Sequence, residues 1–307
     1  MMRPVQTLMF YIEAGGALLA YGLLRILPLP VAATLGEMVL RRLGPLLALH
    51  RVAGDNLRAA FPDRDQAWID GVRDGMWRNL GRTAGEFPHL SKLRDQIGTE
   101  IEIVGGEIID RIKTDGGPMI FLSGHMANWE LMAVVGAHHD IPVDLVYRAP
   151  NNPLIRNLYD KRKPHPDSRL IAKGKDGARD IIRSLKQKRI VGMLIDQKMN
   201  DGTETRFFGM PAMTASAFAP LAARAKCPLV MARIERISGS KFRVTLGTPM
   251  DPPSTGDAAA DLLALIQSVN DTLEGWIRER PEQWLWVHRR WPKPAIAERL
   301  RDLRAEA

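Results

Sequence analysis

The sequence predicts an α/β fold in which a mixed, largely parallel sheet is flanked by helices and preceded by an apolar amino-terminal helix. Three observations predict this arrangement. From about Glu100, short apolar runs alternate with amphipathic stretches, a pattern typical of strands alternating with helices. Residues 7–24 are apolar apart from Glu13. The 307-residue chain is 45% hydrophobic, so it is long and apolar enough to bury a sizeable core.

The amino-terminal apolar segment, Thr7–Leu24, approaches the roughly 20 residues that a membrane-spanning helix needs. Because Glu13 would be costly at mid-depth in a bilayer, a helix lying in one leaflet is an equal alternative, and a buried core helix stays open as a third. A secretory signal is disfavoured, since no convincing small-residue cleavage site follows. Basic residues that follow favour the membrane side carrying anionic lipid, namely Arg25, Arg41, Arg42 and Arg51. We assign residues 1–40 to this membrane-associated segment.

Residues 41–307 are expected to form a single domain, helical over 41–98, α/β over 99–250 and helical again over 251–307. Large apolar residues recur every four positions at Trp68, Val72, Met76 and Leu80, which places them on one helix face. This spacing predicts the main helix of residues 41–98. Strands are predicted over 101–104, 118–123, 142–148, 169–172, 190–196, 229–237 and 242–246. Helices are predicted over 107–113, 127–138, 153–161, 176–188, 214–226 and 256–282.

The composition limits the classes of function. The formal charge is +8 and the sequence pI is about 9.8, which suits an acidic partner such as an anionic membrane surface, a phosphorylated lipid or an acidic carrier protein. Nucleic acid is excluded as a partner because no basic block with interleaved aromatics and no RNP-like sequence occurs. Cys227 is the single cysteine, so no intramolecular disulfide forms, and its apolar surroundings indicate a buried side chain rather than a nucleophile.

The segment Ser123–Glu130 carries the clearest chemical signal. His125 follows the predicted strand 118–123, and α/β folds place their ligands at the carboxyl ends of strands. Residues five apart on a regular helix differ by about 140° in direction. His125 and Glu130 therefore meet only if His125 lies in the turn before the helix. A carboxylate on one ring nitrogen makes the other nitrogen a base for a substrate hydroxyl, so we expect a catalytic pair of His125 and Glu130.

This spacing alone is weak, but further motifs follow in order: Tyr147–Pro153, Asp196-Gln197, Arg206–Gly209 before Thr214, and Pro281–Trp291. With Asp55–Pro62 and the apolar amino terminus, they make the chain resemble the lipid A late (secondary) acyltransferases, called lauroyl or myristoyl acyltransferases, over nearly its whole length. Mycobacterial phosphatidylinositol mannoside acyltransferases share several of the motifs. The resemblance implies acyl transfer from acyl carrier protein, or acyl-CoA, to a hydroxyl of a lipid A precursor. It also implies the cytoplasmic face of the bacterial inner membrane.

The resemblance carries residue roles with it. It matches His125 to the family's catalytic histidine and Glu130 to its orienting acid, and it associates Arg148 and Asn152 with acceptor binding, although Ala149 stands where the family has proline. Further substrate-binding residues are expected at Asn128, Arg169, Asp196, Gln197, Phe208, Gly209 and Thr214. In the basic run 169–179 we favour Arg169 alone as a phosphate ligand and expect the other cations to be solvated. The Trp-rich end is expected to serve packing, and His288 to be structural.

We expect a ternary mechanism without an acyl-enzyme, because no serine or cysteine lies in a nucleophile elbow. No metal and no cofactor beyond the acyl donor are expected. The expected partners are acyl carrier protein, a lipid acceptor and an anionic membrane surface. Three alternatives stay open: another membrane lipid as acceptor, a metal-dependent hydrolase using His125, Glu130, His138 and His139, and a non-catalytic lipid-binding protein.

Overall fold

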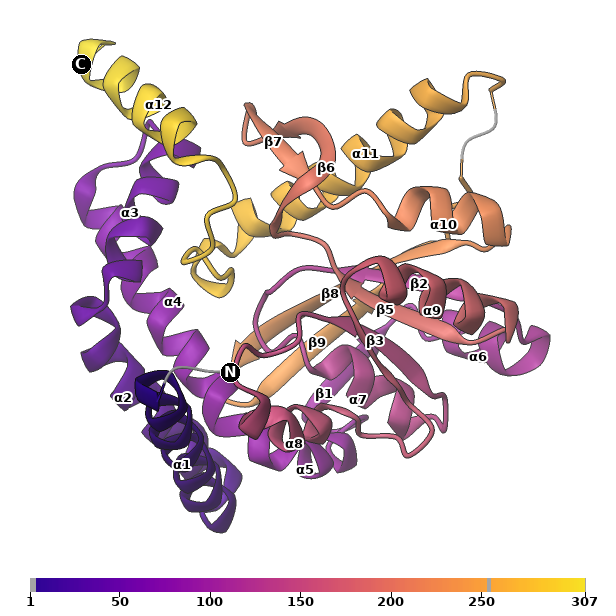
Figure 1. Cartoon of the computed structure of the whole chain (residues 1–307), viewed down its shortest axis with the longest axis horizontal. Coiled ribbons are helices and arrows are strands. Elements are labelled where there is room, and N and C mark those ends of the chain that lie inside the picture. Colours follow the sequence, from indigo (N-terminus) through magenta and orange to yellow (C-terminus); the bar gives the residue numbers. More distant parts are fainter. Residues whose placement is uncertain (1–3, 253–254, 307) are drawn as a thin grey trace.

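A seven-stranded sheet lies at the centre of the protein in a computed structural model that describes residues 4–252 and 255–306 (Figure 1). The strands run in the order β1-β9-β8-β2-β5-β3-β4. Their bounds are β1 Ile101–Val104, β2 Met119–Ser123, β3 Val143–Tyr147, β4 Leu170–Ala172, β5 Ile190–Leu194, β8 Leu229–Ser238 and β9 Lys241–Leu246. Neighbouring strands are parallel except for β8 and β9, which pair antiparallel. The prediction of a mixed, largely parallel sheet flanked by helices is confirmed.

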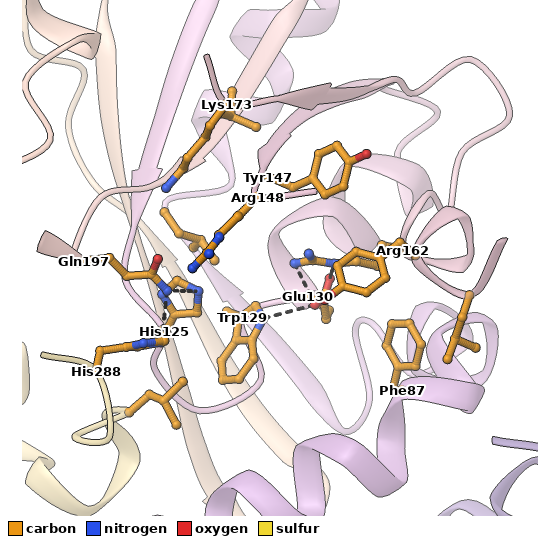
Figure 2. A pocket seen from close by; sticks show the side chains of 15 residues that line it. Phe87, His125, Trp129, Glu130, Tyr147, Arg148, Arg162, Lys173, Gln197 and His288 are labelled. Atoms are coloured by element: carbon orange, nitrogen blue, oxygen red, sulfur yellow. Dashed lines mark hydrogen bonds and ion pairs between the residues drawn. The ribbon is translucent and has the colours of Figure 1, made fainter. Parts of the chain in front are cut away.

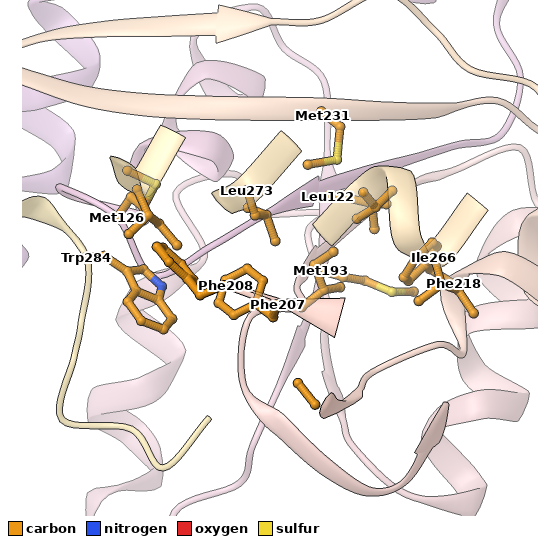
Figure 3. Close-up of a cluster of buried hydrophobic side chains, with 14 of the residues drawn as sticks. Leu122, Met126, Met193, Phe207, Phe208, Phe218, Met231, Ile266, Leu273 and Trp284 are labelled. Carbon is orange, nitrogen blue, oxygen red and sulfur yellow. The ribbon is translucent and has the colours of Figure 1, made fainter. Parts of the chain in front are cut away.

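Helices cover both faces of this sheet and create two hydrophobic clusters. One face is covered by α5 Leu90–Asp95, α6 Glu107–Asp115 and α7 Leu131–His138. The other face is covered by α9 Lys175–Lys186, α10 Phe218–Ala225 and α11 Ala258–Glu279. Figure 3 shows part of this second cluster, where Leu122 of β2 and Met193 of β5 meet Phe207, Ile266 of α11 and Trp284. β2 and β5 are thus buried on both sides, as expected for the central strands of a parallel sheet.

The amino-terminal helices form a separate layer beside the sheet: α1 Pro4–Ile26, α2 Leu29–Leu43, η1 Gly44–Leu46, α3 Ala48–Ala60, α4 Gln66–Glu86 and η2 Phe87–His89. α2 and α4 approach so closely that a Cβ at Gly36 would overlap the carbonyl oxygen of Gly81, and one at Gly85 would overlap that of Ala32. Such contact without side chains between them fixes α2 against α4. The boundary expected at residue 40 therefore falls inside α2, a helix that packs on the domain.

The helix α1 carries most of its apolar side chains in the open. Its residues Gln6–Ile26 are long and apolar enough to cross a membrane, judged by length and composition only, and 6% of the most apolar stretch is buried. Exposed apolar side chains continue along α2 and into the start of α3. We call this surface the apolar face; it comprises Leu8, Met9, Tyr11, Ile12, Leu18, Leu19, Leu23, Ile26, Val31, Leu35, Met38, Val39, Leu43, Leu46, Leu47 and Leu49.

Several elements differ from the sequence-based prediction. The helix expected over 127–138 begins only at Leu131, and the helix expected over 214–226, α10, begins only at Phe218. The stretch expected over 153–161 is divided into η3 Pro153–Ile155, α8 Arg156–Tyr159 and η4 Asp160–Arg162. The antiparallel hairpin of β6 Lys198–Phe207 and β7 Met210–Thr214 was not predicted, because most of β6 is exposed and polar and lacks apolar alternation. The chain ends with η5 Pro281–Gln283 and α12 Lys293–Glu306, which packs on α3.

Candidate active site

The register of the sheet brings His125 and Asp196 together. Ser123, the last residue of β2, pairs with Leu194, the last residue of β5, and the two strands are parallel. His125 and Asp196 each follow two residues later, so they leave neighbouring strands at the same edge. The imidazole Nδ1 lies 2.7 Å from the Asp196 Oδ1, and the backbone N–H of His125 donates to the other carboxylate oxygen at 2.7 Å. The carboxyl edge of the sheet thus holds a His–Asp pair.

Asp196 is held as a carboxylate by the donors around it. Burial alone would raise the pKa of this fully enclosed group, but the N–H groups of His125, and the charge of its ring when protonated, outweigh burial and hold the pKa well below its usual range. The indole N–H of Trp284 donates to the same carboxylate at 2.7 Å. Because an ionised carboxylate only accepts hydrogen bonds, His125 must donate from Nδ1. Its Nε2 therefore carries the lone pair that a general base needs.

The structure corrects the predicted partner of His125. Glu130 accepts from the guanidinium of Arg162 at 2.8 Å and 2.9 Å and from the indole N–H of Trp129 at 3.0 Å, and it does not contact His125. His125 does lie before the helix, as expected. The residues between it and Glu130 do not fold the two side chains together, because α7 starts after Glu130 and the imidazole faces β5. Glu130 lines the same cavity as His125 from another side (Figure 2).

A cavity of about 480 Å³ opens in front of His125 and contains two cations without a carboxylate partner. Arg148 follows the end of β3 and Lys173 follows the end of β4, and both point into the cavity beside His125 (Figure 2). Neither side chain forms an ion pair or a side-chain hydrogen bond with any side chain that the structure describes. Burial against the cavity wall and the nearby Arg148 charge lower the pKa of Lys173, while Asp196 opposes this shift. The carboxyl ends of four adjacent strands thus form a positively charged cavity around one base.

A second imidazole completes this wall. The amide nitrogen of Gln197 lies 3.3 Å from His125 Nε2 and 2.9 Å from His288 Nε2, so it donates to both rings. Burial and the charge of His125 lower the pKa of His288 to about 4, although Asp196 acts in the opposite direction. His288 is therefore neutral at pH 7 and accepts from Gln197. A substrate hydroxyl that approaches Nε2 of His125 takes the place of the weaker of the two Gln197 contacts.

Behind the cavity, a buried network holds the loop that carries His125, and we call it the loop anchor. Its centre is the ion pair of Glu86, which is fully buried, with Arg236, whose two terminal nitrogens lie 2.5 Å and 3.0 Å from the carboxylate. Asn128 in the loop donates to the same carboxylate at 2.9 Å. The carbonyl of Ala127, whose φ of 48° is rare outside glycine, accepts from Thr83 and Asn79 of α4. The loop anchor thus fixes an otherwise unfavourable backbone next to the base.

The remaining predicted substrate-binding residues lie outside this cavity. Asn152 donates to the carbonyl of Phe10 and thereby connects η3 to α1. Arg169 is exposed and donates to Gln187. Phe208 and Gly209 form the turn between β6 and β7, both with positive φ, and Thr214 accepts from the buried Arg290. Asn128 belongs to the loop anchor. Substrate contacts by these residues stay predictions.

Three cavity residues were missed by reasoning from the sequence: Lys173, Arg162 and His288. Lys173 was expected to be solvated, whereas Arg169 in the same basic run was favoured. The available signal was position, because Lys173 directly follows a strand, whereas Arg169 precedes it. Arg162 had no sequence signal, since the short helices around it bring it to Glu130 from 32 residues away. His288 was expected to be structural, yet its ring lies against His125 with centroids 5.2 Å apart.

The fold and the site define an α/β protein in which a His–Asp pair stands at the carboxyl edge of the sheet beside a positively charged cavity. The family of bacterial lipid A biosynthesis acyltransferases matches the chain over residues 6–293. The chain belongs to this family. It is therefore an O-acyltransferase with a late role in lipid A biosynthesis.

Two lipid A acyltransferases of Escherichia coli agree with this assignment. The chain is 25% identical over 263 residues to the lipid A biosynthesis myristoyltransferase of Escherichia coli (strain K12), covering 84% of this chain and 79% of that protein. It is 24% identical over 285 residues to the lipid A biosynthesis palmitoleoyltransferase of the same organism, covering 89% and 88%. Among solved structures, the 1-acyl-sn-glycerophosphate acyltransferase PlsC of Thermotoga maritima matches 83% of this chain and 97% of its own, with a TM-score of 0.39 and 12% identity.

Proposed function

We propose that the protein transfers a fatty acyl chain from the thioester of acyl carrier protein to a hydroxyl of a lipid A precursor, with His125 as the base. The observation that carries the proposal is the His125–Asp196 pair, which leaves Nε2 of His125 as an acceptor at the wall of a cavity. The E. coli relatives, named for myristoyl and palmitoleoyl transfer, support the acyl group and the pathway.

The proposed reaction has one tetrahedral intermediate. Nε2 of His125 removes the proton of the acceptor hydroxyl, and the oxygen attacks the carbonyl carbon of the thioester. The imidazolium that forms is stabilised by Asp196, and the cation of Lys173 stabilises the negative charge on the carbonyl oxygen. The carbon–sulfur bond then breaks, and the leaving thiolate takes the proton from His125. The products are an ester and a free thiol.

The cavity supports direct transfer without an acyl-enzyme. None of the described residues lining it is a serine, threonine or cysteine. Cys227 lies in the core away from the site, and burial raises the pKa of its thiol to about 11. Ser123 is buried at the end of β2. Among the described lining residues, the cavity therefore offers no serine, threonine or cysteine side chain that could carry the acyl group before the substrate hydroxyl receives it.

The charge and surface of the protein support a phosphorylated, membrane-bound acceptor. Arg148 and Lys173 offer positive charge next to the base without a protein partner, which suits phosphate groups near the acceptor hydroxyl. The apolar face suits contact with the hydrocarbon of a bilayer. With these two features, we place the enzyme at the cytoplasmic face of the inner membrane, where acyl carrier protein is available.

The metal-dependent alternative has less support in the side-chain arrangement. Across the described part of the chain, no three His, Cys, Asp or Glu side chains gather in a way that could hold a metal ion. His138 and His139 lie at the end of α7, and His138 contacts the carbonyl of Arg94. They are thus not available to complete a ligand set with His125 and Glu130.

The proposal is tested by assaying the purified enzyme with acyl carrier protein thioester and a lipid A precursor, with products measured by mass spectrometry. His125→Ala is expected to remove transfer, and His138→Ala is the matched control with normal turnover. Asp196→Asn is expected to lower kcat by about 10³- to 10⁴-fold, because it leaves His125 in the wrong tautomer. Glu130→Gln, which affects Arg162, is expected to change KM for the acceptor more than kcat.

Two outcomes would contradict the proposal. Near-normal turnover of folded His125→Ala would remove the assigned base. A loss of kcat in Glu130→Gln as large as that in Asp196→Asn would show that Glu130 supports the base. The acceptor is tested separately in a strain that lacks the protein: loss of one acyl chain from lipid A is expected, whereas unchanged lipid A with an altered phospholipid points to another acceptor.

A further inference from the structure

A second cavity, of about 490 Å³, lies between α3, α12 and the segment that precedes α12. The loop Trp286–Trp291 separates it from the active site: Asn56 in this cavity donates to the carbonyls of Trp286 and His288, both at 2.8 Å, while the ring of His288 lines the cavity of His125. Figure 1 shows α12 against α3, far from α9 and α10 at the other side of the sheet. Nothing in the proposed reaction uses this cavity.

The cavity is strongly positive and its cations have no partners. Its lining includes five cationic residues: Arg51, Arg289, Lys293, Arg301 and Arg304. None of them makes an ion pair or a side-chain hydrogen bond with a side chain that the structure describes. The single carboxylate in the lining, Asp55, lies 3.5 Å from Arg58. In the same chain, most other arginines that line a helix or strand surface are paired, as in Arg41 with Asp74. Five unpaired cations around one cavity predict an anionic ligand.

The floor of the cavity adds a buried donor and an apolar surface. Trp291 lines the cavity with 1% of its surface exposed, and its indole N–H has no hydrogen-bond partner in the described structure. A buried N–H without a partner is costly, and a bound acceptor removes this cost. Val52, Ile296 and Leu300 supply apolar lining beside it. The site therefore combines cations, a donor and an apolar wall, which fits the phosphate of a lipid rather than a small hydrated anion.

The position of the cavity favours a lipid over an acidic protein. The apolar face ends at Leu46, Leu47 and Leu49, whose exposed fractions are 79%, 47% and 43%. Leu47 immediately precedes α3, and Arg51, which lines the cavity, lies in the first turn of that helix. The cationic cavity thus adjoins the end of the apolar face. A lipid whose chains lie against the apolar face places its phosphate at the level of this cavity.

From these observations we infer that the α3–α12 cavity binds the phosphate headgroup of an anionic membrane lipid and so fixes the orientation of the enzyme on the bilayer. The inference rests on the proposed membrane location for the source of its ligand. It does not involve His125, so the enzyme in detergent keeps its turnover when the site is removed. Failure of this inference and failure of the proposed function are therefore separable.

The test compares binding of the full chain to vesicles of phosphatidylcholine alone and to vesicles that also contain phosphatidylglycerol. Arg301→Gln combined with Arg304→Gln is expected to weaken binding to the anionic vesicles by about 30-fold, since each cation near a charged surface contributes on the order of 1 kcal/mol. Binding to the neutral vesicles is expected to stay unchanged. The matched control removes two unpaired cations elsewhere, Lys186→Gln in α9 with Arg224→Gln in α10, and is expected to keep nearly full affinity.

A third variant distinguishes a specific binding site from general electrostatic attraction between the protein and an anionic membrane. Trp291→Phe keeps the charge and most of the volume but removes the buried N–H. It is expected to weaken the binding of a short-chain phosphatidylglycerol, below its micelle concentration, by about fivefold, the loss of one hydrogen bond. Equal losses in the α3–α12 and control variants would overturn the inference, as would normal binding by Trp291→Phe. Intact vesicle binding with lost binding of acyl carrier protein would assign the cavity to the carrier and also overturn it.

Discussion

The two sides of the His125 loop differ in how their charged side chains are paired. On the side of the loop anchor, Glu86 and Arg236 are buried, and the carboxylate accepts from Arg236, Asn128 and Ser240. On the side of the cavity, Arg148 and Lys173 have no carboxylate partner. Paired charges that are buried hold a conformation, whereas unpaired charges at a cavity remain available to a ligand. The difference separates residues that position the base from residues that bind the substrate.

The largest effect is expected at the loop anchor. Glu86→Gln leaves the buried Arg236 without a counter-charge, so the free energy of unfolding is expected to fall by about 3–5 kcal/mol. Urea unfolding measures the loss. Glu100→Gln, which breaks an exposed pair with Lys241 at 2.9 Å, is the matched control with an expected change below about 1 kcal/mol. Equal changes in both variants would show that the loop anchor does not differ from a surface ion pair.

A smaller effect is expected from pH at the border between the two sides. Since the pKa of His288 is about 4 in the folded protein and near 6.5 in the unfolded chain, the unfolded state binds the additional proton between these values. Stability therefore falls as pH is lowered from 6.5 to 4, by about 3 kcal/mol. His288→Asn is expected to flatten this part of the curve of unfolding free energy against pH. A variant curve parallel to the wild type across this window would refute the assignment.

The smallest effect is expected at the unpaired cations of the active site. Arg148→Gln is expected to raise KM for the acceptor by about tenfold, the loss of one charge-assisted hydrogen bond, with kcat and stability nearly unchanged. Arg169→Gln, an exposed arginine outside the cavity, is the control. Thermal unfolding of both variants checks that the change is in binding. A loss of stability in Arg148→Gln with KM unaltered would place Arg148 among the structural charges instead.

The pattern of apolar runs was sufficient to predict the seven strands of the sheet, because central strands such as β2 are buried throughout and an outer strand such as β9 alternates buried and exposed residues, and both patterns are local. The same pattern missed β6 and β7, because β6 is largely polar; the buried apolar residues of the hairpin, Phe207 and Met210, lie at its turn, and the hairpin also contacts α11. The site was predicted in part. His125, Asp196 and Gln197 were all named, but as separate motifs, with Glu130 as the partner of His125.

The wrong partner has a physical reason. Five residues separate His125 from Glu130, whereas 71 separate it from Asp196. Their contact depends on β2 lying next to β5 in register, and the order of strands is set by long-range packing of the helices between them. Reasoning from local sequence alone favours Glu130, the nearer acidic residue, as the partner of His125. Knowledge of the strand order would have identified Asp196, since both residues stand at the same distance beyond their paired strand ends.

The glycine contact between α2 and α4 fixes the distance between the apolar face and the His125 loop. α2 carries part of the apolar face, and α4 carries Asn79, Thr83 and Glu86, which hold the His125 loop. Because Gly36 and Gly81 leave no side chain between the two helices, α2 and α4 move as one rigid unit. In the proposed arrangement, in which α2 rests on a bilayer, the proposed base His125 therefore stands at one fixed height above the lipid. Only a hydroxyl presented at that height is within its reach.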